Sequence, residues 1–434
     1  MWLHDRMEPK VEVARERINR VLTQHRKKKI GEIRVNQIFN GLRGMDILIS
    51  DVSFVDPQDG LQYRGYKVKD VLDLLPKAEN SDFPLAGGLY YLMLVGDLPT
   101  RQDALDIEEE WRRRSDLPYH VADMLRAMPK DTHPMVMFSQ AILALESRSE
   151  FSINYKNGLQ KEKFWRPMLT DSLSLTAKAP AIAAAIYNIK YHNNPLIPPS
   201  QEHDWSANFA YMIDKNRDEK YKNLSRLFFI IHADQGIGNV SAHSGLLVNS
   251  ALSDVFFSCS AAINGLAGPL HGRANQDCLE WLLSIRNKFG KCPSETELEA
   301  YIWETLNRGK VIPGYGHPIL REIDPRFLIQ YEFGKKYMAD DELFQLAEMV
   351  YQVAPRVLKE QGKAKNPWPN IDAISGTLQY HCGIKEFDFY TVLFGVGRVL
   401  GLTANLVWSR ALYSPLERPQ SITMDMLEEK INKA

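Results

Sequence analysis

The chain has 434 residues, of which 44% are hydrophobic and 25% are charged. These proportions are typical of a folded, water-soluble protein and exclude a disordered or collagen-like chain. The 53 Lys and Arg residues nearly balance the 54 Asp and Glu residues, which excludes the basic surplus of a dedicated nucleic-acid-binding protein.

Length, cysteine content and the N-terminal residues limit the number of domains and the compartment in which the protein is expected. At roughly 150 residues per domain, the length predicts about two to three domains. The four cysteines are scattered, so we expect a reducing compartment, with neither a disulfide framework nor a zinc site. No apolar run approaches the roughly 18 residues of a membrane span. Residues Met1–Asp5 lack the apolar core of a signal peptide, so we expect any organelle presequence to lie outside this sequence.

The N-terminal part predicts one helix and one hairpin. Apolar residues at helical spacing predict a helix over residues 10–24, with Pro9 suited to its first turn. An apolar stretch from Ile47 to Phe54, a turn at Pro57–Gly60 and a returning segment over residues 61–68 then predict a small β-hairpin.

Beyond residue 84 the pattern is almost entirely helical. An apolar stripe from Leu343 to Leu358 predicts a helix that Gly362 ends, and the stretch Leu173–Ile189 predicts a helix broken near Pro180. Residues Val392–Leu412 are apolar on nearly every side, so we expect them to cross the centre of the protein or a subunit interface. The sequence therefore predicts a mainly α-helical fold. The other helical stretches are Leu89–Val95, Met135–Leu145, Leu224–Ile231 and Asn239–Leu252.

The first polar segment between these helices runs from His232 to His243. Gly236 and Gly238 imitate a dinucleotide-binding loop, but the third glycine and the βαβ rhythm of that fold are missing. Ser241 and His243 imitate a hydrolase pair, but residues two apart on a helix do not face each other. Each histidine here is, by itself, more often a hydrogen-bonded core residue than a catalytic one.

Two further loops combine glycine, proline and histidine. Asn264–Asn275 places His271 at a break between helices, where tight turns let the backbone approach a ligand. A histidine that merely caps a helix gives the same pattern. Val311–Pro318 repeats the design and carries His317 near its end.

Two more features point to anionic ligands. Asp324 and Pro325 are typical of an N-cap and first turn, which places Arg326 where free N–H groups favour a carboxylate. The proline-rich segment Lys363–Asp372 offers two lysines for phosphates. Its last residue, Asp372, is either a general base or part of an Asx turn.

Taken together, three of these segments resemble the citrate synthase family. Gly265–Asn275, Pro313–Arg326 and Lys363–Asp372 stand in the family's order and spacing, and three long motifs in order are highly specific. The resemblance runs over nearly the whole chain, from Gly41 to Pro419, and is strongest to the eukaryotic, mitochondrial type.

The resemblance implies a two-domain, mainly α-helical homodimer with one small β-hairpin near the N-terminus. It implies a large, dimer-forming domain of residues 1–272 and 384–434, and a small domain of residues 273–383 that closes over the active-site cleft. It further implies the mitochondrial matrix and two substrates, oxaloacetate and acetyl-CoA. No tightly bound cofactor, metal, nucleic acid or membrane is expected.

The implied reaction joins acetyl-CoA to oxaloacetate and hydrolyses the thioester, giving citrate and CoA, the first step of the tricarboxylic acid cycle. A thioester methyl group is a weak acid, so a base must remove its proton while a donor stabilises the enolate oxygen. By motif position the resemblance implies Asp372 as the base and His271 as the donor. It implies His317 as the group that polarises the ketone of oxaloacetate.

The resemblance also implies a binding set. Planar guanidinium groups suit the carboxylates of oxaloacetate, and Arg418 is expected from the partner subunit. The residues implied for oxaloacetate are His232, Gln235, Arg326, Arg398 and Arg418. The residues implied for CoA are Arg43, Pro313, Gly314, Tyr315, Arg321, Lys363 and Lys365.

Three positions depart from the family pattern. Gln235 stands where the family has a histidine, and glutamine donates hydrogen bonds but carries no positive charge. Ile374 replaces a residue that is usually polar, and Lys161 stands where a CoA-contacting arginine is expected. These changes leave open two alternatives: a 2-methylcitrate synthase that uses propionyl-CoA, and a catalytically weakened paralogue retained for structural assembly.

Overall fold

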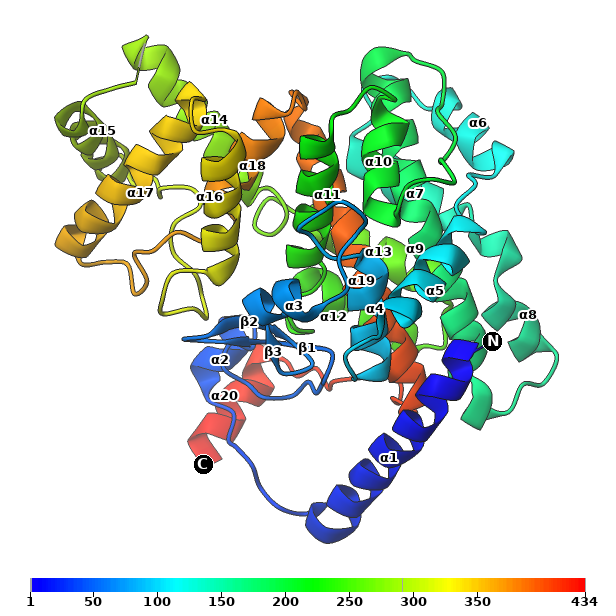
Figure 1. Cartoon of the computed structure of the whole chain (residues 1–434). Coiled ribbons are helices and arrows are strands. Elements are labelled where there is room, and N and C mark those ends of the chain that lie inside the picture. The colour runs from blue at the N-terminus through cyan, green and yellow to red at the C-terminus, as the bar shows by residue number, and fades with distance from the viewer. Residues whose placement is uncertain (1, 291, 434) are drawn as a thin grey trace.

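The computed structural model describes residues 2–290 and 292–433 of the chain. Helices make up most of these residues, and one small sheet lies near the N-terminus (Figure 1), which confirms the prediction of a mainly α-helical fold. The helices are α1 (Trp2–His25), α2 (Val35–Phe39), α3 (Val68–Leu74), α4 (Ala86–Val95), α5 (Arg101–Arg112), α6 (Tyr119–Ala127), α7 (Pro134–Leu143), η1 (Glu146–Arg148), α8 (Glu150–Lys156), η2 (Lys161–Lys163), α9 (Trp165–Tyr187), η3 (Asn188–His192), α10 (Trp205–Ile213), α11 (Glu219–Ile231), α12 (Val240–Ser250), α13 (Val255–Leu266), α14 (Ala274–Phe289), α15 (Glu295–Asn307), α16 (Pro325–Tyr337), α17 (Glu342–Gln361), α18 (Asp372–His381), η4 (Phe387–Phe389), α19 (Tyr390–Ala411) and α20 (Met424–Lys433).

The sheet contains three antiparallel strands in the order β1 (Ser53–Asp56), β2 (Gly60–Tyr63) and β3 (Tyr66–Lys67). The hairpin prediction is therefore correct in place, because β1 and β2 pair across the predicted turn. The predicted first strand is too long, since Ile47 and Ile49 precede β1 and are 55% and 93% exposed. The ladder between β1 and β2 ends at the pair Ser53 and Tyr63, so it does not extend toward Ile47.

The first helix begins earlier than predicted. α1 starts at Trp2, so Pro9 lies inside it and not in its first turn. Leu3, Met7 and Val11, four residues apart, are the buried residues of α1. Pro9 is exposed, so the carbonyl that its missing N–H leaves free faces water.

The predicted break near Pro180 is absent, because α9 continues from Trp165 to Tyr187. A proline inside a helix removes the hydrogen bond to the carbonyl four residues earlier. In α9 that carbonyl belongs to buried Thr176, and the indole Nε1–H of Trp205 donates to it at 2.8 Å. A side chain from α10 therefore replaces the bond that Pro180 removes.

α19 crosses the centre of the molecule and packs against α9, α13 and α12. This confirms the expectation from its all-round apolar sequence. The segment Phe387–Ala411 is also long and apolar enough to span a membrane, contrary to the expectation that no run reaches that length, but all of its apolar window is buried inside the protein. α17 ends as predicted, with Gly362 in the left-handed conformation at φ 71°.

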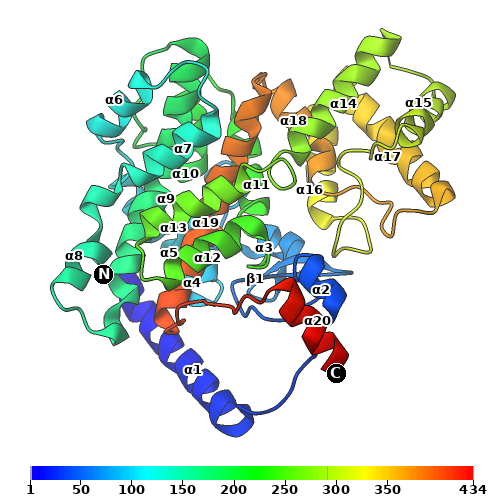
Figure 2. The same cartoon turned by 180° about the vertical axis from the view of Figure 1, so that it is seen from behind.

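Helices α14 to α18 form a group at one side of the other helices in two opposite views (Figures 1 and 2). α14 and α16 both pack against α18, and α15 packs against α17. The group also touches the sheet, because the backbone N–H of Arg321 donates to the carbonyl of Pro57 at 2.7 Å. The loops that carry the predicted site residues lie where the group meets α11, α12 and α19.

Candidate active site

The first of the predicted site residues, His232, lies at the C-terminal end of α11. Its Nδ1–H donates to the carbonyl of Phe228 at 2.8 Å, so its Nε2 carries the lone pair. That Nε2 is buried and has no hydrogen-bond partner among the described residues. Burial lowers the pKa of His232 to about 3, so the ring is neutral.

His271 lies in the tight turn between α13 and α14. A Cβ on the next residue, Gly272, would approach the carbonyl oxygen of Leu266 to 2.2 Å, so only glycine fits this turn. The backbone N–H and the hydroxyl of Ser241 lie 3.4 and 2.9 Å from Nε2 of His271. Because a backbone N–H can only donate, Nε2 accepts and Nδ1 carries the proton. Burial, reinforced by the charge of Arg398, lowers the pKa of His271 to about 4.

His317 presents the opposite ring nitrogen. Its Nδ1 accepts hydrogen bonds from the backbone N–H groups of Ile319 and Leu320 at 3.1 and 3.0 Å. The proton is therefore on Nε2, which lies 3.1 Å from Nε2 of Gln235. Both nitrogens carry hydrogen in this state, so the two side chains do not hydrogen-bond to each other and both can donate to a ligand oxygen. Burial and the charge of Arg326 lower the pKa of His317 to about 4, so this ring is also neutral. Gln235 and His317 are 82 positions apart in the sequence, and the fold brings their side chains together.

Asp372 is the first residue of α18, and its backbone N–H donates to Oδ1 of Asn370 at 2.9 Å. Its carboxylate has no hydrogen-bond partner among the described residues, so it is free to accept a proton. Burial raises the pKa of Asp372 to about 6, although the charges of Arg326 and Arg398 oppose the shift. A carboxylate with a pKa near the working pH is suited to general-base chemistry.

Arg326 stands in the first turn of α16, and Asp324 caps that helix, as the sequence predicts. The guanidinium is 2% exposed and donates to both carboxylate oxygens of Asp324, with Nη2 to Oδ2 at 2.7 Å. Burial alone raises the pKa of Asp324, but Arg326 outweighs it and holds that pKa below its usual value. Asp324 is thus the counter-ion of a buried arginine next to the base.

Arg398 on α19 is completely buried. Its Nε donates to the carbonyl of His232 at 3.2 Å, and its Nη1 donates to the side chains of Asn239 and Ser241 at 3.3 and 3.4 Å. Its Nη2 is buried without a partner among the described residues. No carboxylate forms an ion pair with it in the part of the chain that is described. A buried guanidinium with a free N–H group is suited to an anionic ligand.

The loop of Pro313, Gly314 and Tyr315 packs directly against the loop that carries the base. The backbone N–H of Asn370 donates to the carbonyl of Gly314 at 2.9 Å. Gly314 has φ +79°, and a Cβ there would lie 2.6 Å from Cα of Ala373, the residue after the base. The two loops therefore hold each other, and only glycine fits at the contact.

The structure does not bring all predicted residues to this centre. Arg43, Lys363, Lys365 and Arg418 are exposed, and none of their side chains makes a hydrogen bond or ion pair among the described residues. The guanidinium of Arg321 is exposed as well and donates to carbonyls of its own loop, including those of Ile319 and Leu320 at 2.8 Å. The other two residues that depart from the family pattern are Ile374 and Lys161. Ile374 is 1% exposed inside α18, and Lys161 lies over the ring of Tyr413.

Sequence reasoning missed a buried network beneath the site. Oδ2 of Asp234 accepts hydrogen bonds from Oγ of Ser53 and Nδ2 of Asn405, both at 2.8 Å. Ser53 also accepts from the backbone N–H of Gly236 at 2.7 Å. The network joins β1, the loop after α11, and α19. A single aspartate between His232 and Gln235 was the only available signal.

No group of three or more His, Cys, Asp or Glu side chains within residues 2–290 and 292–433 is arranged to hold a metal ion. The site instead combines one carboxylate, two neutral imidazoles that donate through different nitrogens, and two buried guanidinium groups. This set can remove a proton, stabilise oxyanions and hold a carboxylate ligand.

Comparison with known proteins gives one consistent result. The sequence model described as "Citrate synthase, C-terminal domain" matches residues 41–420. Citrate synthase 4, mitochondrial, of Arabidopsis thaliana is 44% identical over 432 residues, covering 100% of this chain and 91% of that protein. The mitochondrial citrate synthase of Xiphias gladius is 46% identical over 412 residues, covering 95% and 88%. The crystal structure of citrate synthase from Pyrobaculum aerophilum superposes with a TM-score of 0.78 at 26% identity, covering 92% of this chain and 95% of that one.

Proposed function

The chain belongs to the citrate synthase family, and from this premise we propose how its residues carry out the reaction. The enzyme is an acyltransferase that condenses acetyl-CoA with oxaloacetate and hydrolyses the thioester to citrate and CoA. The observation that supports the assignment of roles is that the buried charge of Arg326 or Arg398 acts on Asp372, His271 and His317 alike, with both rings neutral.

The first step forms the nucleophile. Asp372 removes a proton from the methyl group of acetyl-CoA, while Nδ1–H of His271 donates to the thioester carbonyl oxygen. The pKa of about 6 supports the carboxylate as base, because the group is ionised at neutral pH yet more basic than an ordinary aspartate. Ser241 holds the ring of His271 in the tautomer that presents Nδ1–H.

The second step forms the carbon–carbon bond. The enolate carbon attacks the ketone carbon of oxaloacetate, and the ketone oxygen takes its proton from Nε2–H of His317. The two backbone donors to Nδ1 of His317 support this role, because they fix the proton on the nitrogen that faces Gln235. Water then cleaves the resulting thioester and releases CoA and citrate.

Oxaloacetate is held by charge and by hydrogen bonds. Arg326 and Arg398 offer buried guanidinium groups for its carboxylates, and Nη2 of Arg398 is free to donate. The side-chain amide of Gln235, next to Nε2 of His317, donates a further hydrogen bond to oxaloacetate. Nε2 of His232, a buried lone pair, accepts a hydrogen bond from a hydroxyl group as the product forms. Arg418 completes the set from the partner subunit.

CoA lies along the edge of the same cleft. The Pro313–Tyr315 loop contacts the loop of the base, so a ligand bound there is adjacent to Asp372. Positive side chains surround this edge and suit the phosphates of CoA. They are Arg43, Arg321, Lys363 and Lys365. CoA is a substrate here, and no tightly bound cofactor is proposed.

We propose the domain division and its motion on the same basis. Residues 1–272 and 384–434 form the large domain, and residues 273–383 form a small domain that closes over the cleft. The separate packing of α14 to α18 supports this division. Closure brings His317, Arg326 and Asp372 toward His271 and Arg398 and excludes water from the enolate.

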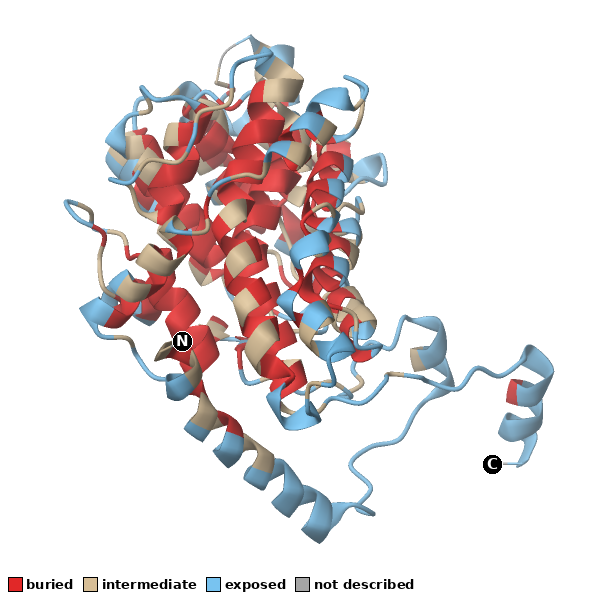
Figure 3. Ribbon diagram, turned by 90° about the vertical axis from the view of Figure 1, so that its right-hand side faces the viewer, coloured by how far each residue is buried: buried red, intermediate tan, exposed pale blue. Residues whose placement is uncertain are grey.

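We also propose a homodimer in the mitochondrial matrix. The relatives in the comparison are named as mitochondrial proteins, which supports the compartment. The dimer is supported by two mostly exposed segments, residues 13–50 and 414–433, that project from the rest of the chain (Figure 3). They carry exposed apolar side chains, which favour burial against a second chain. These are Val21, Leu22, Ile30, Ile33, Ile49, Met424 and Met426.

The experiment is steady-state release of free thiol from acetyl-CoA, with and without oxaloacetate, repeated with propionyl-CoA. We expect release that requires oxaloacetate and a higher kcat/KM for acetyl-CoA. One methylene group is worth about 1–3 kcal/mol in a pocket, so a preference of roughly tenfold or more is expected. Release that is independent of oxaloacetate contradicts the proposal, and a preference for propionyl-CoA identifies a 2-methylcitrate synthase instead.

A further inference from the structure

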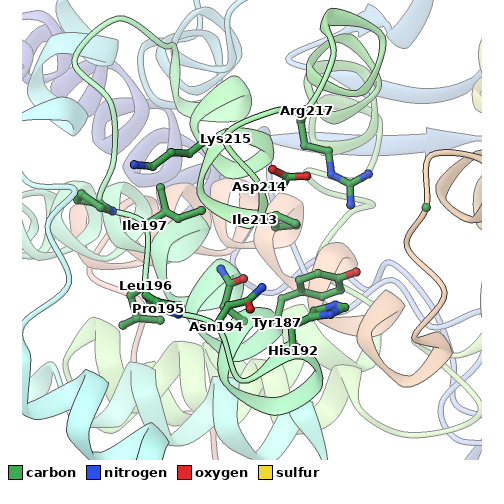
Figure 4. A pocket seen from close by; sticks show the side chains of 13 residues that line it. Tyr187, His192, Asn194, Pro195, Leu196, Ile197, Ile213, Asp214, Lys215 and Arg217 are labelled. Atoms are coloured by element: carbon green, nitrogen blue, oxygen red, sulfur yellow. The ribbon is translucent and has the colours of Figure 1, made fainter.

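None of the residues assigned to the active site above lines a second feature of the structure, a cavity of about 460 Å³. It is bounded by the end of α9 and η3, the segment 194–198, the end of α10, and Gly383 (Figure 4). Its volume lies within the range of roughly 300–1,000 Å³ that is usual for small-molecule sites. The cavity sits at the C-terminal end of α18, whereas Asp372 begins that helix.

Two polar groups in the wall of this cavity have no partner. The side-chain amide of Asn188 is 1% exposed, and its Nδ2 donates to the carbonyl of Met212 at 2.9 Å, which fixes the orientation of the amide. Its Oδ1 is buried without a hydrogen bond among the described residues. Nε of Arg217 is likewise buried and unpartnered. A buried polar atom without a partner costs about 1–3 kcal/mol, so each is a site for a ligand atom.

The geometry of Arg217 specifies an anion. Its Nη1 donates to the carbonyl of Cys382, and its guanidinium lies 4.9 Å from the ring centroid of Tyr221. These contacts leave Nε and Nη2, the two donors of one edge, without an acceptor in the described chain. That edge matches two oxygens of a carboxylate or phosphate.

The other residues that line the cavity indicate the charge and the apolar part of a suitable ligand. Lys215 lies across the cavity from Arg217 and adds a second positive charge, while Asp214 between them holds the net charge to +1 (Figure 4). Leu196, Ile197 and Ile213 supply an apolar surface. Oδ1 of Asn188 requires an O–H or N–H donor.

From these contacts we propose that the cavity is a binding site for a small organic anion that carries a hydroxyl or amino group. Its carboxylate or phosphate binds the free edge of Arg217, its donor binds Asn188, and its carbon skeleton lies against Leu196 and Ile197. This site is separate from the oxaloacetate and CoA sites.

The same arginine connects the cavity to catalysis. Arg217 donates to the carbonyl of Cys382, the C-cap of α18, and Nζ of Lys220 lies 3.2 Å from Nε2 of His381 in the last turn of that helix. α18 spans ten residues, or about 15 Å at the usual rise, and begins with Asp372. A ligand that engages Arg217 therefore acts on the helix that positions the base. This coupling rests on the role proposed for Asp372.

The test measures binding first, without turnover. Calorimetric titration of the full chain uses two probes, glycerol 3-phosphate and 3-hydroxybutyrate, which distinguish a phosphate ester from a carboxylate. The variants are Lys215→Glu, at an exposed side chain that makes no hydrogen bond or ion pair in the described chain, and Ile197→Trp, which fills the cavity. The matched control is Lys156→Glu, an exposed lysine at the end of α8.

We expect at least one probe to bind once per chain, with an affinity that Lys215→Glu and Ile197→Trp each reduce at least tenfold and Lys156→Glu leaves unchanged. The probe that binds more tightly identifies the anionic group. Equal binding to wild type and both cavity variants, or no binding of either probe, overturns the site.

Thiol release with the bound probe then tests the coupling. We expect the probe to change kcat or the KM for oxaloacetate at least twofold in the wild type and in Lys156→Glu, but not in Lys215→Glu. Binding without any such change overturns the coupling. Because binding is measured without catalysis, failure of the site and failure of the proposed function give different results.

Discussion

At the scale of single residues, the raised pKa of Asp372 results from burial, which outweighs the positive charges around it. Two buried guanidinium groups favour its ionised form, and burial disfavours it more strongly. Asp324 offsets part of the influence of Arg326, because its two carboxylate oxygens accept hydrogen bonds from that side chain and its own charge raises the pKa of Asp372. The base is therefore surrounded by positive charge and still keeps a raised pKa, which an isolated aspartate on a surface does not.

We expect Asp372→Asn to lower kcat by about 10²–10⁴-fold, the usual contribution of a general base. CoA binding should remain within a few-fold of the wild type, because the amide has the shape of the carboxylate and Asp372 is not assigned to the nucleotide. Thiol release gives kcat, and titration with CoA gives the affinity. A variant that retains turnover within a few-fold of the wild type removes Asp372 from the role of base.

The pH dependence of kcat follows from the same group. Protonation of Asp372 removes the base, so we expect kcat to fall as the pH drops below about 6. His271 and His317 have pKa values of about 4, so both rings stay neutral through this range and do not limit the rate. A plateau above the pKa and a decline of about tenfold per pH unit below it are expected for one ionisation. A rate that is constant down to pH 5 contradicts this assignment.

The residues of the site differ in how far the sequence reveals them. His271, His317 and Asp372 stand in Gly- and Pro-rich motifs whose order identifies the family, and in the structure the charge of Arg326 or Arg398 acts on each of them. Asp234, Ser53 and Asn405 come from three distant segments and carry no local pattern. Their contacts depend on how β1 and α19 meet the loop after α11, which no single segment specifies.

At the scale of elements, helix α9 illustrates how tertiary structure overrides a local rule. Pro180 predicts a break, yet the indole of Trp205 supplies a hydrogen bond to the carbonyl of Thr176. The prediction of a break failed because the replacement donor comes from another helix. The prediction of where α1 starts failed for a similar reason. Leu3 and Met7 pack against the rest of the protein, and this contact extends the helix from Pro9 back to Trp2.

The replacement bond predicts a double-mutant cycle. Trp205→Phe leaves the buried carbonyl of Thr176 without a donor, so we expect the free energy of unfolding to fall by about 1–3 kcal/mol from the lost bond, with lost packing in addition. In Pro180→Ala the restored backbone N–H donates to the same carbonyl, so Trp205→Phe should cost less there. Urea unfolding followed by circular dichroism measures both steps. Equal costs of Trp205→Phe in the two backgrounds exclude the replacement bond.

At the scale of the whole molecule, the proposed oxaloacetate residues do not all lie together in the single chain. Arg326 and Arg398 are at the site, but Arg418 lies in the exposed segment after α19. That segment is anchored by neighbours of Arg418: Nε2 of His243 lies 2.9 Å from Oε1 of Glu417, and the backbone N–H of Glu417 donates to Ser250. Arg418 is thus held on the surface beside α12, accessible to the second chain of the proposed dimer.

This arrangement predicts complementation between two inactive variants. Asp372→Asn lacks the base, and Arg418→Gln lacks an oxaloacetate contact, so each homodimer should be impaired at both sites. If Arg418 acts across the interface, a mixed dimer has one site with both lesions and one site with none. Co-expression with two different tags and tandem purification isolates the mixed dimer, which we expect to recover about half of the wild-type activity per dimer. If Arg418 acts within its own chain, every site of the mixed dimer carries one lesion and activity stays low. The measurement therefore tests, in one assay, the dimer, the shared site and the role of the base.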